Sequence, residues 1–151
     1  MKVTAQEEYG LRCILQLARQ FSSDPVTGRQ IANLEGLSFE YVSKLLMILR
    51  RSKLVKSVRG VRGGYALTRE PETIMLGEVL RALSKDDGVI LTSPNSKMCN
   101  HFPGQLEACI HLNACAILPV WDALSEYLSG MLDNISLKDL LQKTPKVLEV
   151  V

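Results

Sequence analysis

Several features are scarce in this sequence of 151 residues, and each scarcity excludes a class of protein. The longest unbroken apolar run, residues 114–121, contains a proline and is far shorter than the roughly 20 residues of a membrane-spanning helix. No apolar stretch follows the first basic residue, Lys2, so the N-terminus does not have the form of a secretory signal. We therefore expect a cytoplasmic protein with no membrane partner, in a compartment where thiols stay reduced.

Histidine is also scarce, with two residues in the chain, and no pairing of a nucleophile with a base is recognisable. These absences argue against an enzyme, including one built around a small metal centre. The composition is otherwise that of a folded protein, because 46% of the residues are hydrophobic and 23% are charged. A chain of this length has room for one ordinary domain or for a small domain with an appendage.

Acidic residues are missing from one long stretch of the chain. Residues 44–69 contain eight lysines and arginines and no acid, although the whole chain has 18 basic and 16 acidic residues and a formal charge of +2. The rest of the chain therefore has 10 basic and 16 acidic residues, a charge of −6. A strongly basic segment inside an otherwise acidic protein indicates a face that binds a polyanion.

The N-terminal half has the pattern of a helix-turn-helix. The spacing of apolar residues predicts helices over 7–21, 30–34 and 39–51. Thr27 is placed to cap the second of these helices and Ser38 to cap the third. The short turn that joins them contains glycine, and two helices joined in this way are typical of the helix-turn-helix.

The apolar period then changes from about 3.6 residues to about two, which is the period of a strand. Strands are predicted over 54–59 and 65–68, and the glycine-rich, cationic connection between them is typical of a hairpin, or wing. A short helix over 75–83 completes a winged helix-turn-helix domain, which we place at residues 1–84.

The remaining sequence divides into a cysteine-containing loop at 85–117 and a long helix with a C-terminal tail at 118–151. The expected fold class is therefore mainly α, a winged helix-turn-helix followed by a long C-terminal helix. A long amphipathic helix outside a complete domain needs a surface to cover, and we expect a second copy of itself. The predicted dimer interface consists of Val120, Trp121, Leu124, Tyr127, Leu128, Met131 and Ile135.

Double-stranded DNA is the polyanion that this fold predicts, because the start of the second helix of a helix-turn-helix enters the major groove. There, Glu40 is suited to a cytosine amino group and Phe39 to a thymine methyl group. Arg59 and Arg62 on the wing are suited to a minor groove, whose negative potential attracts arginine. The predicted DNA contacts are Ser38, Phe39, Glu40, Tyr41, Ser43, Lys44, Arg59 and Arg62. The alternatives are a protein-binding winged helix with a solvated basic face, and core positions for Phe39 and Tyr41.

Three of the four cysteines have the spacing Cys99-x9-Cys109-x5-Cys115. This spacing is neither the paired Cys-x2-Cys of zinc ribbons nor the ferredoxin pattern. From the residues alone, three alternatives stay open: a metal or iron–sulfur site, redox-reactive thiols, or unliganded structural cysteines. Cys13 lies inside the first predicted helix, where a cysteine is more often a packing residue.

The sequence resembles the IscR/NsrR family of bacterial winged-helix regulators. The likeness extends over nearly the whole chain, and its most specific part is the wing motif Val-Arg-Gly-x-x-Gly-Gly-Tyr at 58–65. The resemblance implies a homodimer joined by the C-terminal helix and bound to palindromic operator DNA. IscR-like members use a recognition-helix glutamate to discriminate between operator classes. The matching residue here is Ser43, so that preference does not carry over.

The resemblance also implies that the three loop cysteines hold an iron–sulfur cluster, either 2Fe–2S or 4Fe–4S. The histidine that IscR-like proteins use as fourth ligand is matched here by Leu118, whereas the carboxylate used in NsrR-like proteins is matched by Glu8 of the partner subunit. The other candidates for the fourth ligand are His101, His111, Glu7 and Cys13, and a site without a fourth protein ligand is the remaining alternative. The expected function is a DNA-binding repressor that senses cluster status, redox state or nitric oxide. The alternatives are a cluster-free thiol-redox regulator and a winged-helix protein-interaction adaptor.

Overall fold

A computed structural model describes residues 3–84 and 116–142 of the protein. These residues are mainly helical with one two-stranded antiparallel sheet, so the expected fold class is confirmed. The elements in chain order are α1 (Ala5–Arg19), α2 (Gly28–Glu35), α3 (Phe39–Arg51), β1 (Val55–Val58), β2 (Gly64–Leu67), the 3-10 helix η1 (Pro71–Thr73), α4 (Leu76–Leu83), α5 (Leu118–Leu132) and α6 (Leu137–Leu141). None of the helices in these two ranges is long and apolar enough to cross a membrane.

Side-chain caps define where the helices begin. Thr27 and Gln30 form the predicted capping box of α2, and the Ser38 hydroxyl accepts a hydrogen bond from the backbone N–H of Tyr41 at the start of α3. A second capping box, formed by Thr4 and Glu7, starts α1 two residues earlier than its apolar pattern predicts. The helix also ends two residues earlier, at Arg19.

The main core lies where α1, α3, α4 and the base of the wing meet. The inward side of α3 is completely buried, as its spacing predicts, and it packs against α1 residues such as Ile14 and Leu17. Leu137 of α6 is also fully buried in this core, and its N–H donates to the carbonyl of Ile74 at 2.9 Å. The core of the winged domain therefore includes a residue from the C-terminal part of the chain, beyond the predicted boundary at residue 84.

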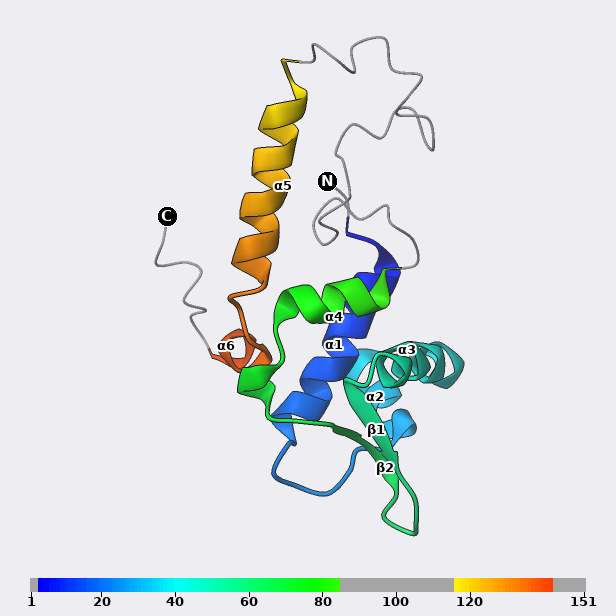
Figure 1. Cartoon of the computed structure of the whole chain (residues 1–151). Coiled ribbons are helices and arrows are strands. Elements are labelled where there is room, and N and C mark those ends of the chain that lie inside the picture. Colours follow the sequence, from blue (N-terminus) through cyan, green and yellow to red (C-terminus); the bar gives the residue numbers. More distant parts are fainter. Residues whose placement is uncertain (1–2, 85–115, 143–151) are drawn as a thin grey trace.

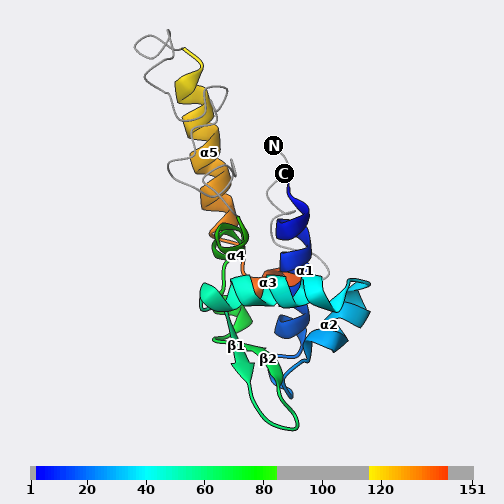
Figure 2. The ribbon, with the colours of Figure 1, turned by 90° about the vertical axis from the view of Figure 1, so that its right-hand side faces the viewer.

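A smaller cluster joins α5 to the winged domain. It consists of Leu76, Leu80, Leu132 and Ile135, each at most 9% exposed. Ile135, which the sequence places on the dimer-forming stripe, lies beyond the end of α5 and is 6% exposed, so burial within its own protomer leaves it almost no surface. Above this cluster α5 extends away from the other helices (Figures 1 and 2).

The wing is a short hairpin that projects from the body next to α3 (Figure 2). Its strands pair in a register that places Val55 opposite Leu67 and Val58 opposite Gly64. Val26, between α1 and α2, pairs with Tyr65 through two backbone hydrogen bonds of 2.8 and 2.9 Å. The base of the wing is therefore tied to the segment that leads into α2.

Candidate nucleic-acid interface

The start of α3 presents the polar side chains that the sequence assigns to DNA. Ser38, Glu40 and Lys44 are exposed, and Ser43 is half-buried. Because the apolar side of α3 is buried in the core, these polar residues lie on the side of the helix that faces away from it. The first turns of α3 therefore have the exposure that a recognition helix needs to read base edges.

The two aromatic residues at this end of α3 differ in their surroundings. Tyr41 is half-buried and makes an edge-to-face contact with Tyr9 of α1, with ring centroids 6.1 Å apart. Phe39 is 45% exposed, and the guanidinium carbon of Arg29 lies 5.7 Å from its ring centroid. Tyr41 therefore helps to fix α3 on α1, whereas Phe39 belongs to the accessible surface.

The tip of the wing is a tight turn whose shape depends on glycine. Gly60 has a φ of +119°, which L side chains rarely adopt, and its carbonyl accepts a hydrogen bond from Gly63 N–H at 2.9 Å. Arg59 and Arg62 are both exposed beside this turn. Nη1 of Arg62 lies 3.7 Å from a carboxylate oxygen of Asp24, so the wing tip has one acidic neighbour.

The basic segment identified in the sequence forms an exposed surface. All eight of its lysine and arginine side chains are exposed. Arg69 is paired with Glu78, and Arg62 with Asp24. The six others have no ion pair within the described residues; they are Lys44, Arg50, Arg51, Lys53, Lys56 and Arg59. Their charges are available to an external polyanion.

Of the residues predicted to hold an iron–sulfur cluster, the structure describes only the proposed carboxylate ligand, Glu8. Cys99, Cys109, Cys115, His101 and His111 lie outside the described residues. Glu8 is on α1, and its exposed carboxylate accepts a hydrogen bond of 2.8 Å from Arg12. Among the residues that the structure describes, no three histidine, cysteine or acidic side chains are grouped as a metal site requires.

Two of the alternative ligands are unsuitable. Glu7 is 1% exposed, and its carboxylate accepts hydrogen bonds from the backbone N–H of Thr4 at 2.8 Å and the hydroxyl of Ser84 at 2.9 Å. Cys13 is completely buried, and burial, reinforced by the negative charge of Glu35, raises the pKa of its thiol to about 12. Both side chains have structural roles in the folded protomer.

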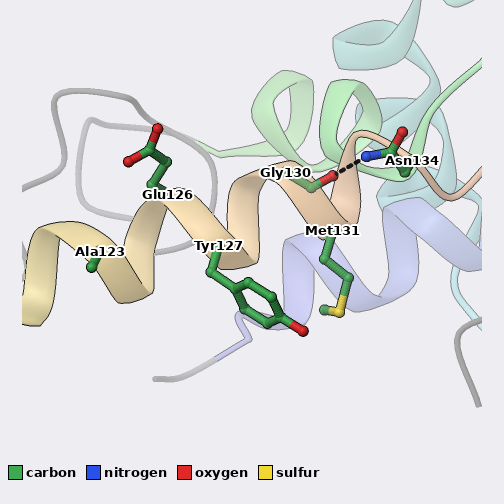
Figure 3. Close-up of a pocket in the computed structure, with 6 residues that line it drawn as sticks. All are labelled: Ala123, Glu126, Tyr127, Gly130, Met131 and Asn134. Atoms are coloured by element: carbon green, nitrogen blue, oxygen red, sulfur yellow. Dashed lines mark hydrogen bonds between the residues drawn. The ribbon is translucent and has the colours of Figure 1, made fainter. Parts of the chain in front are cut away.

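The apolar face of α5 is open to solvent in this single chain. Val120, Leu124 and Tyr127 are 60%, 39% and 66% exposed, and Leu128 and Met131 are half-buried. The side chain of Trp121 lies outside what the structure describes. A groove of about 570 Å³ follows the helix between Ala123 and Asn134, and the side chains of Tyr127 and Met131 line it (Figure 3).

The sequence pattern of this face extends one turn further than predicted. Ile117, just before α5, is 58% exposed, and it starts a series 117, 120, 124, 127, 131 with alternating steps of three and four residues. This is the spacing of a helix seam. Extending the three-and-four spacing backwards past Pro119 adds Ile117 to the predicted interface.

Comparison with known proteins identifies the family. Residues 3–143 match the Rrf2 family model, described as an iron-dependent transcriptional regulator. The HTH-type transcriptional regulator IscR of Klebsiella pneumoniae is 33% identical over 141 residues, which is 93% of this chain and 80% of that protein.

Solved structures give the same result. T. potens IscR has a TM-score of 0.72 and 32% identity, covering 93% of this chain and 86% of that one. The oxidized form of Staphylococcus aureus CymR has a TM-score of 0.71 and 26% identity, covering 95% of this chain and 98% of that one. These relatives are transcriptional regulators and not enzymes. The chain belongs to the Rrf2 family of winged-helix transcriptional regulators.

Proposed function

We propose that this protein is a cytoplasmic repressor that binds a palindromic operator as a homodimer. The exposed start of α3 enters the major groove, and the wing places Arg59 and Arg62 in the adjacent minor groove. The observation that carries the proposal is the set of exposed basic side chains without ion pairs, which continues from α3 into the wing. Release of counterions from DNA phosphates by such side chains provides sequence-independent affinity, and the polar residues of α3 supply base readout.

The homodimer is proposed to form along α5. Its exposed apolar series has the three-and-four spacing of a helix seam, and the helix extends beyond the winged domain, where a second copy can reach it. Among the large apolar side chains of α5 that the structure describes, Val120, Leu124 and Tyr127 are the most exposed. Pairing two such helices buries this surface and sets the distance between the two α3 helices at about 34–36 Å or a multiple of it.

The regulatory ligand is proposed to be an iron–sulfur cluster on Cys99, Cys109 and Cys115, with Glu8 of the partner subunit as fourth ligand. The family description as iron-dependent and the IscR relatives support this proposal. The carboxylate of Glu8 is exposed and can reach a ligand, whereas the side chains of the alternative ligands Glu7 and Cys13 are buried. When bound, a cluster offsets the charge of three thiolates and ties their loop to the protein, which is the kind of order–disorder element that a switch uses.

A cluster-free thiol regulator is the second candidate. One specific observation favours it: a solved structure similar to this chain over 95% of its length is of an oxidized form of CymR. Here, oxidation of Cys99, Cys109 or Cys115 is the signal, since thiol oxidation is selective for exposed cysteines of low pKa. Buried Cys13, whose thiol pKa is raised to about 12, is not a sensor in either version.

DNA binding is tested with a duplex selected by the full chain from a random-sequence pool. Fluorescence anisotropy over a range of salt concentrations gives the logarithmic salt slope. About three phosphate contacts per subunit give a slope near −5 for the dimer, since each contact contributes about −0.9. Binding without salt dependence, or no selection of any duplex, contradicts the proposed function and favours the protein-interaction adaptor.

The cluster is tested on protein purified without oxygen. Iron and sulfide analysis, visible absorbance and electron paramagnetic resonance together report whether a cluster is present and of which type. A brown protein with matching iron and sulfide supports the proposal. A colourless, iron-free protein after reconstitution contradicts it and favours the thiol regulator.

A further inference from the structure

An arginine and an aromatic ring lie together next to the proposed recognition surface. The interface predicted from sequence includes the ring, Phe39, but not the arginine, Arg29. Arg29 is the second residue of α2, and Phe39 is the first residue of α3. The guanidinium carbon of Arg29 lies 5.7 Å from the centroid of the Phe39 ring. Both side chains are exposed, and Arg29 has no ion pair or hydrogen bond among the described residues.

Gly28 makes this arrangement possible. A Cβ atom at residue 28 would lie 3.1 Å from Cε2 of Phe39 and 3.8 Å from Cε2 of Tyr65. The missing side chain therefore lets the Phe39 ring approach the start of α2, at the point where α2, α3 and β2 converge. The Phe39 ring therefore lies against Gly28 at the start of α2, and Arg29 lies over the ring next to the first turn of α3.

An arginine whose guanidinium lies over an aromatic face keeps its N–H donors free for another partner. Contact with the ring restricts the rotamers of the side chain, so less conformational entropy is lost when those donors bind. A phosphate diester is the ligand that matches this fork, through two parallel charge-assisted hydrogen bonds. The first helix of a helix-turn-helix crosses the DNA backbone, and α2 is that helix in this protein.

We infer that Arg29, positioned by Phe39, binds a phosphate of the DNA backbone next to the bases that α3 reads. This inference rests on the proposed function, and it extends the DNA interface to α2. Phe39 then acts as a positioning residue for Arg29, which is an alternative to the thymine contact predicted for it from sequence. Arg29 adds a positive charge that lies outside the basic segment 44–69.

The experiment measures binding of the full-length dimer to a duplex selected from a random-sequence pool. Arg29→Ala is expected to weaken binding about tenfold and to reduce the salt slope by about 2, one contact for each subunit. Phe39→Leu is expected to weaken binding by a similar factor, and the double variant no further than Arg29→Ala alone. The thermal midpoint of each variant is measured as well, and Arg29→Lys, which keeps the charge, is expected to retain the salt slope.

Arg12→Ala is the matched control. Arg12 also lies over an aromatic ring, 5.8 Å from the Tyr9 centroid, but its charge is already paired with Glu8. We expect its removal to leave the salt slope unchanged. An unchanged salt slope for Arg29→Ala overturns the inference, and so does an equal change in slope for Arg12→Ala. The inference is also overturned if the double variant loses affinity by the product of the factors for Arg29→Ala and Phe39→Leu, because the two side chains then act independently. If the dimer selects no duplex, the proposed function itself is overturned. If Arg29→Ala has no effect but Arg59→Ala weakens binding, the wing binds DNA and only the inference about Arg29 fails.

Discussion

Arg81 of α4 and Asp133, directly after α5, form a two-pronged ion pair. Nη2 of Arg81 donates to Oδ1 of Asp133 at 2.7 Å, and Nη1 donates to Oδ2 at 3.1 Å. Gly77 lies beneath this pair, and a Cβ atom there would approach Cγ of Asp133 to 3.0 Å. The pair and the small apolar cluster beside it join the proposed dimer helix to α4 of the winged domain.

Gly77→Ala is expected to remove the coupling between Arg81 and Asp133. The new methyl group displaces the Asp133 carboxylate, a flexible side chain, so the backbone does not have to move. The free energy of unfolding should change by less than about 1 kcal/mol, because the pair is partly exposed and alanine favours the helix. A double-mutant cycle of Arg81→Ala and Asp133→Ala measures the coupling by urea denaturation. We expect about 0.5 kcal/mol in the wild type and none in the Gly77→Ala background; equal coupling in both contradicts the prediction.

Glu7→Ala and Glu8→Ala should differ sharply in stability although the residues are adjacent. Truncation of the buried Glu7 side chain removes the acceptor for partly buried donors of Thr4 and Ser84 and should cost about 1–3 kcal/mol. Truncation of exposed Glu8 should cost less than about 0.5 kcal/mol. Urea denaturation of cluster-free protein measures both. If Glu8 is a cluster ligand, its variant changes the cluster spectrum while the free energy of unfolding of the cluster-free protein stays the same.

The local structure of this protein was largely predictable from its sequence. The caps at Thr27 and Ser38 and the change of period before the wing depend on neighbouring residues, and each is present close to its predicted bounds. The return of Leu137 to the main core and the burial of Ile135 were not predictable, because both depend on how the chain after α5 packs back on the segment that leads into α4. The contact between Arg29 and Phe39 is also not predictable from the sequence, since a helix pattern does not show which exposed side chains of two helices meet.

The thiol of Cys13 should make the protein less stable at high pH. Its pKa is raised from 9.0 to about 12 in the folded state, chiefly by burial. Above pH 9 the unfolded chain therefore releases a proton that the folded chain retains, and stability falls by at most about 1.4 kcal/mol per pH unit. The difference in free energy of unfolding between wild type and Cys13→Ala, measured from pH 8 to 10.5, isolates this effect. A constant difference contradicts the prediction, and alkylation of Cys13 in the native protein at pH 8 does too.

Leu124→Asp and Tyr127→Asp should each convert the proposed dimer into monomers of 16.8 kDa. Both residues lie on the exposed apolar series of α5, and a carboxylate placed in a helix seam loses its hydration without gaining a partner. We expect the dimer dissociation constant to rise at least about 100-fold, measured by sedimentation. Asp122→Lys, on the opposite side of the helix by its spacing, is the control and should leave the dimer intact. A dimer that persists in both seam variants excludes α5 as the interface.

Asp24→Asn should strengthen DNA binding through its effect on the wing. The Asp24 carboxylate lies 3.7 Å from Arg62, and both side chains are largely exposed, so it competes with DNA for the same guanidinium. Anisotropy on a selected duplex should show about a twofold to threefold gain at low salt, which disappears as salt screens the pair. Arg59→Ala and Arg62→Ala should each weaken binding and reduce the salt slope by about 2 for the dimer. In an Arg62→Ala background, Asp24→Asn should have no effect; a gain that survives there shows that Asp24 repels the DNA directly and does not act through Arg62.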